Sequence, residues 1–159
     1  MHQFLAKWIV PGLLLSTFAV AVPADAAAQP DLKVRVLLKK RQRDGKWFVR
    51  ARFRVYNVGA VLAGPTTVGA WCLANIGGGQ CPALDGDYDV VPPVEPGATG
   101  VVLLATPAIP AGANVTVNGP VTEEWQPGNY TVAAMADFPE ALAEAIEANN
   151  RGRAVIAIP

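Results

Sequence analysis

The sequence predicts an all-β fold, an antiparallel β-sandwich of about seven strands. Apolar and polar side chains alternate in several short runs, which is the period of a strand with one buried face. Turn signals rich in Gly, Pro, Asn and Asp separate these runs at roughly 8–12-residue intervals. A parallel α/β sheet would need helices of about a dozen residues between its strands. Only Glu140–Ala148 predicts a helix here, and it is short.

The first two predicted strands, Asp31–Leu38 and Trp47–Asn57, form an antiparallel hairpin. Between them, the segment KKRQRDGK predicts a polar turn around Asp44-Gly45, a dipeptide that favours tight hairpins. In both strands apolar side chains share one face and basic side chains share the other, as in antiparallel sheets with one solvated face. The apolar set is Leu32, Val34, Val36, Leu38, Val49, Ala51, Phe53 and Val55.

Further segments have strand character: Pro65–Leu73, Tyr88–Val94, Gly100–Ala105, Asn114–Asn118, Asn129–Ala136 and Arg151–Ile158. Tyr88–Val94 contains two prolines and therefore belongs at a sheet edge. Trp71, Trp125 and Tyr130 are expected in or beside the core. The hydroxyl of Tyr130 could also bond to nearby backbone, as in the tyrosine corner of Greek-key sandwiches.

Residues 1–28 predict a cleaved signal peptide, and residues 29–159 a single domain. The apolar run Trp8–Val22 is short for a bilayer span, which needs roughly 20 residues, although a membrane anchor is the alternative. Small residues at Ala24–Ala28 suit cleavage after Ala26 or Ala28. No other segment is long and apolar enough to span a membrane. We therefore expect a secreted or periplasmic bacterial protein.

Cys72 and Cys81 are the only cysteines in the chain. In an exported protein, a small even number of cysteines predicts a disulfide. Free thiols or half of a metal site are the alternatives. The metal site is disfavoured because the sequence after the signal has no histidine and the spacing is wider than in a CxxC pair.

The residue types that drive hydrolysis are scarce. The only histidine and the only serine, His2 and Ser16, lie in the predicted signal, so no Ser/His/Asp or Cys/His triad can form. Paired carboxylates remain at Glu123-Glu124 and at Glu144 with Glu147. The first pair points to opposite faces of a strand, and the second is expected to lie exposed on a turn. The sequence predicts no enzyme and no cofactor.

Acidic residues alternate in the segment DGDYD, where Asp85, Asp87 and Asp89 are weak calcium candidates. The segment lacks the glycine and glutamate positions of an EF-hand loop, so a solvated acidic loop is the favoured interpretation. A second oxygen-rich group follows Asp137, and hydrogen-bonded turn chemistry is favoured there over calcium.

Charge is unevenly distributed along a chain whose formal net charge is zero. Ten of the twelve basic residues after residue 28 lie before position 55, and ten of the twelve acidic residues lie after position 84. Alternation predicts one basic sheet face, made of Lys33, Arg35, Arg50, Arg52 and Arg54. Such a face could bind an anionic polysaccharide or an acidic protein, or it could simply be solvated. Few aromatic residues accompany it, so no nucleic acid is expected.

Three segments, FRVYNVGA, VEPGATGVV and GNYTVAAMADFPEALAEAIEANN, resemble the bacterial cell-adhesion-related domain family, CARDB. The resemblance covers about residues 30–158 and implies an immunoglobulin-like sandwich in an extracytoplasmic setting. Its motifs match turn residues at Asn57, Gly59, Pro96, Gly97, Asp137, Glu144, Glu147, Asn149 and Asn150. The long connection Pro107–Gln126 and the cysteine pair depart from the family pattern.

A fold of this kind hosts many roles, so it fixes no ligand. We expect a non-catalytic binding or adhesion module that uses the basic face. The alternative is a structural or assembly subunit of the cell envelope that pairs through its strand edges.

Overall fold

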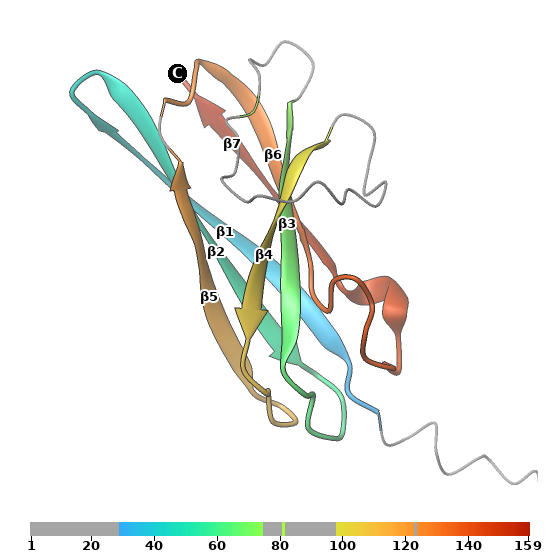
Figure 1. Cartoon of the computed structure of the whole chain (residues 1–159). Coiled ribbons are helices and arrows are strands. Elements are labelled where there is room, and N and C mark those ends of the chain that lie inside the picture. The colour runs from blue at the N-terminus through green and yellow to red at the C-terminus, as the bar shows by residue number, and fades with distance from the viewer. Residues whose placement is uncertain (1–28, 75–80, 82–97, 123) are drawn as a thin grey trace, which may run out of the picture.

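The computed structural model describes residues 29–74, 81, 98–122 and 124–159, which form two face-to-face sheets (Figure 1). One sheet has the order β1-β2-β5 and the other has the order β4-β3-β6-β7, with every pairing antiparallel. The elements are β1 (Leu32–Arg43), β2 (Lys46–Asn57), β3 (Thr66–Ala74), β4 (Ala98–Thr106), β5 (Asn114–Thr122), β6 (Gly128–Met135), a 3-10 turn η2 (Glu147–Asn149) and β7 (Arg151–Ile158). The predicted all-β sandwich is confirmed.

The hairpin of β1 and β2 is longer than the sequence pattern predicted. Asp44 and Gly45 both have positive φ, 50° and 73°, which is the backbone of a two-residue hairpin turn whose twist matches the flanking strands. Arg43 therefore pairs with Lys46, and pairing continues without a break to Leu32 and Asn57. The predicted hairpin turn at Asp44-Gly45 is confirmed, but the other residues of the segment KKRQRDGK belong to the two strands and not to the turn.

Other boundaries also differ from prediction. β4 begins at Ala98, two residues before the predicted start at Gly100, and β5 continues beyond Asn118 to Thr122. The predicted helix Glu140–Ala148 is absent, and only η2 is helical there. The Glu144 side chain accepts a hydrogen bond from the backbone nitrogen of Leu32, and the backbone nitrogen of Leu142 donates to the side chain of Asp137. Both contacts compete with helix formation. Residues 1–28 and Tyr88–Val94 lie outside the described part of the chain. Within that part, no helix has the length and apolarity needed to cross a bilayer.

The core lies between the two sheets and contains the predicted apolar faces of β1 and β2. Leu32, Phe53 and Val55 are fully buried there, with Val68, Ala70 and Cys72 of β3 facing them. A second apolar cluster lies on the other face of the four-stranded sheet, where Trp71 packs with Val101, Ala133, Met135 and Phe138. β3 and β6 are therefore buried on both faces.

β1 and β7 lie side by side and close one side of the sandwich. The Lys40 ammonium donates a hydrogen bond to the carbonyl oxygen of Ala157. Gly152 approaches β1 so closely that a Cβ there would lie 2.3 Å from the carbonyl oxygen of Val34. From the contact of Val34 with Gly152 to the contact of Lys40 with Ala157, residue numbers increase along both strands. The two strands therefore run in the same direction.

Candidate anion-binding face

The solvent-facing side of the three-stranded sheet carries the five basic residues that the sequence singled out. Lys33 and Arg35 lie on β1, and Arg50, Arg52 and Arg54 lie on β2. All five are exposed, while their immediate neighbours along each strand point inward and are buried. The alternation of the sequence is thus the alternation of the two faces of this sheet.

The register of the hairpin brings like charges directly opposite each other. Arg35 pairs with Arg54, and Lys39 pairs with Arg50. Directly opposite side chains on an antiparallel pair have Cβ atoms roughly 4.5–5.5 Å apart, and like charges in such positions are destabilising. The sheet therefore retains an arrangement that folding alone does not favour.

Lys39 and Arg41 extend the same face towards the hairpin turn. Together with the five predicted residues they make a set that we call the cationic face: Lys33, Arg35, Lys39, Arg41, Arg50, Arg52 and Arg54. Both added residues are exposed. The pattern of the sequence could have placed them, because a two-residue turn at Asp44-Gly45 fixes the pairing of every residue before and after it.

The carboxylates of the residues that the structure describes do not neutralise the cationic face. In the described part of the chain the salt bridges are Arg43–Asp44 and Lys46–Glu124, both next to the hairpin turn and both exposed. The hydrogen bond from Lys46 and its charge lower the pKa of Glu124. β5 completes the sheet beside β2 with the neutral residues Asn114, Thr116 and Asn118 opposite Tyr56, Arg54 and Arg52. Among the residues that the structure describes, the cationic face therefore carries charge of one sign.

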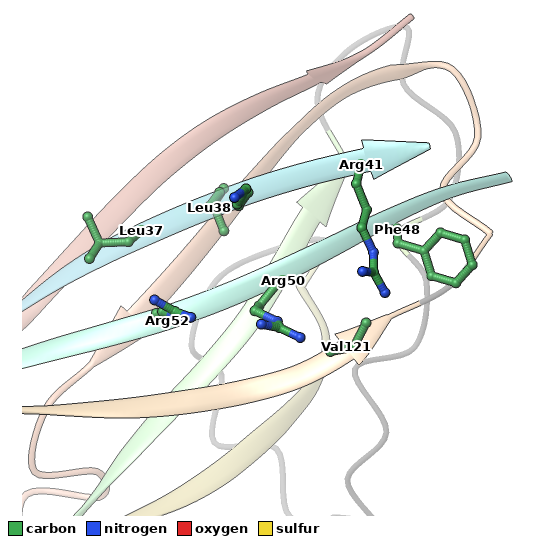
Figure 2. A pocket seen from close by; sticks show the side chains of 8 residues that line it. Leu37, Leu38, Arg41, Phe48, Arg50, Arg52 and Val121 are labelled. Carbon is green, nitrogen blue, oxygen red and sulfur yellow. The ribbon is translucent and has the colours of Figure 1, made fainter. Parts of the chain in front are cut away.

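A depression of about 280 Å³ lies at the end of the cationic face nearest the hairpin turn (Figure 2). Its lining combines cations with apolar side chains from three strands: Leu37, Leu38, Lys39, Arg41, Phe48, Arg50, Arg52 and Val121. The Arg41 guanidinium carbon lies 5.7 Å from the centroid of the Phe48 ring, within the range of a cation–π contact. Val121 is 43% exposed. The sequence analysis did not place Phe48 or Val121 at this site.

The opposite end of the sandwich is held by the predicted turn residue Asn57. Its side-chain oxygen accepts hydrogen bonds from the backbone nitrogens of Asp31 and Gly59, at 3.3 and 3.1 Å. Its amide nitrogen donates to the carbonyl oxygens of Val61 and Ile109, at 2.7 and 2.8 Å. Asn57 is fully buried and joins three backbone segments through four hydrogen bonds. Gly59 is packed against the chain just before β1, where a Cβ would lie 2.5 Å from the backbone nitrogen of Asp31.

The acidic segment between β6 and β7 docks onto the start of β1. Asp137 is buried and accepts hydrogen bonds from the Thr66 hydroxyl and, at 2.7 Å, from the backbone nitrogen of Leu142. Glu144 accepts from the backbone nitrogen of Leu32 at 2.6 Å. It also accepts from the Asn150 amide at 3.0 Å. The expectation that Glu144 is exposed was wrong, because only 6% of it is accessible.

Two neighbouring hydrogen bonds complete this docked segment. The Asn149 amide donates to Asp31 at 2.7 Å, and the backbone nitrogen of Glu144 donates to the exposed Glu147 at 3.0 Å. Burial raises the pKa of Glu144 to about 7, and the nearby Glu147 and Asp137 add to the rise. Hydrogen bonds from Leu32 and Asn150 oppose it. These acidic groups are thus engaged in holding the chain rather than aimed into a cleft.

Cys72 and Cys81 form a disulfide with Cα atoms 5.9 Å apart, as predicted. The Tyr130 hydroxyl donates to the carbonyl oxygen of Gln126 at 2.9 Å, which is the predicted contact to nearby backbone. Its ring meets Trp125 edge to face, with centroids 4.8 Å apart. These contacts fix the fold away from the cationic face.

The predicted calcium candidates Asp85, Asp87 and Asp89 lie outside the described residues, as do Pro96, Gly97 and Glu123. Across the ranges that the structure describes, no group of three or more His, Cys, Asp or Glu side chains is arranged to hold a metal ion.

Comparison with known proteins gives matches in structure and not in sequence. No family model matches the chain, and neither does any curated protein. The crystal structure of a Pyrococcus furiosus CARDB domain, in complex with di-metal ions, has a TM-score of 0.54 and 14% identity, covering 82% of this chain and 90% of that one. The solution NMR structure of the same domain gives 0.53 and 14%, covering 82% and 95%. The fold of this chain is therefore similar to that of a CARDB domain, an immunoglobulin-like sandwich, and its described residues form seven strands.

Proposed function

We propose that this chain is a non-catalytic, adhesion-type binding module that recognises an anionic polymer at the bacterial cell envelope through its cationic face. The observation that carries the proposal is the pairing of Arg35 with Arg54 and of Lys39 with Arg50. Like charges held opposite each other cost stability, and a bound polyanion would offset that cost.

The composition of the face favours a polymer over a folded acidic protein. The centres of protein–protein interfaces are depleted of charge and rich in apolar anchors. Here the arginines of β2 occupy the middle strand of the sheet, between β1 and β5. Guanidinium groups can bind carboxylate or phosphate oxygens in pairs, which suits a chain that bears many such groups.

Two features support the proposed envelope setting: the predicted signal at residues 1–28 and the disulfide between Cys72 and Cys81, which suits an oxidising compartment. The fold likeness to CARDB domains agrees with an adhesion-related role. Mass spectrometry of protein recovered from outside the cytoplasm should give a mature chain that begins after Ala26 or Ala28. Recovery of the intact chain in the cytoplasm would contradict this part of the proposal.

Retention on a generic polyanion tests the binding role. We expect the protein that begins at Gln29 to bind dextran sulfate beads, to ignore neutral dextran beads, and to elute as salt screens the contacts. An Arg52→Glu/Arg54→Glu variant should elute at clearly lower salt. The matched variant Arg151→Glu/Arg153→Glu, which changes the same net charge on exposed residues of β7, should elute like the native protein.

Equal retention on both kinds of beads would contradict the proposal, and so would equal elution of the two variants. Thermal unfolding of each variant checks that the sandwich is intact before its elution is compared.

A further inference from the structure

The depression beside Phe48 differs chemically from the rest of the cationic face. Between Lys33 and Arg54 the neighbouring side chains are polar, with Tyr56, Thr116 and Asn118 paired across the strands. At the depression the neighbours are apolar, namely Leu37, Phe48 and Val121. A ligand that offered only charge would leave this apolar part of the surface in water. The depression therefore suits a ligand that offers an apolar surface as well as charge.

The cations and apolar groups of the depression alternate across three strands. Arg41 lies opposite Phe48, Leu37 lies opposite Arg52, and Arg50 lies opposite Val121. Figure 2 shows the side chains of Arg41 and Arg50 reaching across this surface beside Phe48 and Val121. Alternate residues on one strand are about 7 Å apart, and adjacent strands are about 5 Å apart. The patch has the size of one small ring with its substituents.

An acidic sugar unit has both properties. Its ring presents C–H groups on one face, and its carboxylate is a planar acceptor that a guanidinium can bind through two parallel hydrogen bonds. We infer that the depression is a subsite for one uronic acid unit of an anionic polysaccharide, an inference that rests on the proposed function. The ring covers Leu37, Phe48 and Val121, and the carboxylate is bound by Arg50 and Arg52.

The other cations of the cationic face extend from the depression along β1 and β2. Along β2, Arg54 follows Arg52 at the two-residue spacing of the strand, about 7 Å further on. On β1, Arg35 and Lys33 lie opposite Arg54 and Tyr56. Further units of the chain would place their carboxylates on these residues, which make contact by charge alone. The depression then selects the sugar, and the remaining cations add affinity.

Two polyanions separate this inference from general charge attraction. The probes are an oligogalacturonate of defined length and a linear polyphosphate of matched total charge, each titrated calorimetrically at the same ionic strength. We expect the native protein to bind the oligogalacturonate about tenfold more tightly than the polyphosphate, since polyphosphate has no ring to cover the apolar side chains.

Substitutions separate the contribution of the apolar side chains to binding from the contribution of the arginines. Phe48→Ala should weaken oligogalacturonate binding about tenfold and leave polyphosphate binding unchanged. Val121→Thr, an isosteric change on an exposed residue, should act in the same direction even if Phe48→Ala perturbs the hairpin. Val155→Ala is the matched apolar control, because Val155 is 68% exposed on β7 and lies off the face. Arg50→Gln/Arg52→Gln should weaken the binding of both polymers.

The outcomes distinguish the sugar subsite from the general polyanion-binding role. Equal affinity for both polymers, with no effect of Phe48→Ala and Val121→Thr, would overturn the uronic acid subsite and leave the polyanion-binding role standing. Binding of neither polymer, or no effect of Arg50→Gln/Arg52→Gln, would overturn both. Tighter binding of single-stranded DNA than of oligogalacturonate would also overturn the inference.

Discussion

The carboxylate of Glu144 accepts a hydrogen bond at 2.6 Å from the backbone nitrogen of Leu32, 112 positions away in the sequence. Leu32 is the first residue of β1 and is fully buried. This contact, together with the hydrogen bond from Ala145 to the carbonyl oxygen of Pro30 at 2.9 Å, attaches the segment between β6 and β7 to the start of the first strand. A titratable side chain thus takes part in closing the fold.

Glu144 should make the stability of the protein depend on pH. Its pKa in the folded state is raised to about 7 from an ordinary value of 4.5, chiefly by burial. Between these values the folded protein binds more protons than the unfolded one, so the free energy of unfolding falls as pH rises and levels off above about 7. The total loss from this group is of the order of 2–3 kcal/mol.

Glu144→Gln should flatten this dependence and make the variant more stable than the native protein at pH 8. The neutral amide can still accept from Leu32, and it can donate to the side-chain oxygen of Asn150, which is buried without a partner. Urea unfolding from pH 4.5 to pH 8 measures the effect. Glu140→Gln, an exposed neighbour in the same segment, should keep the native slope. A native curve that rises through this window would contradict the assignment.

Asn57→Ala should lower the free energy of unfolding by about 3 kcal/mol. The change removes all four side-chain hydrogen bonds and leaves buried backbone groups without partners, at about 1–3 kcal/mol for a group that stays unpaired. Asn118→Ala, on the exposed face of β5, should change stability by less than about 0.5 kcal/mol. Chemical denaturation of both variants tests the difference. Equal losses would show that Asn57 does not join the segments as described.

Gly59→Ala should destabilise the protein although Gly59 has no positive φ. The added methyl group would meet backbone atoms of Gln29 and Asp31 at 2.5 Å. These two residues lie immediately before β1, so their backbone cannot move without disturbing that strand. We expect a loss of roughly 1–3 kcal/mol, as for overpacking elsewhere. Gly64→Ala is the matched control, because its Cβ would meet only a Leu142 methyl at 3.8 Å. Similar thermal midpoints for the two variants would contradict this prediction.

Loss of the disulfide should lower stability by roughly 2–3 kcal/mol, which is the chain-entropy estimate for a short closed loop. Both sulfur atoms belong to residues packed in the core, so the Cys72→Ala/Cys81→Ala variant also loses some packing. The thermal midpoint with and without reductant separates the two effects. Native protein should shift on reduction, whereas the variant should not respond to reductant.

The sequence predicted the features that depend on local alternation. The apolar and basic faces of β1 and β2 follow from side chains that change sides at every residue, and the structure has them as predicted. The positions of Lys39, Arg41 and Phe48 on the cationic face were also derivable. They required only that the Asp44-Gly45 turn be taken as two residues long, with the strands continuing to it.

The features that depend on distant contacts were not predictable from one sequence. The segment around Glu144 has the composition of a helix. Nothing in the sequence near Glu144 indicates that its carboxylate is buried and accepts a hydrogen bond from the backbone nitrogen of Leu32. Val121 reaches the depression through a register shift between Arg50 and Arg52, beside Gly119 and Pro120, which interrupt the period of β5. A bulge of this kind changes which side chains face a site without leaving a periodic signal.

The parallel course of β1 and β7 has a mechanical consequence. A pull applied before Asp31 and after Ile158 would slide these two neighbouring strands along each other. The contacts of Lys40 with Ala157 and of Gly152 with Val34 would then bear the force together instead of opening one after another. Force applied at both ends of the domain would therefore load the contact between the two sheets in shear.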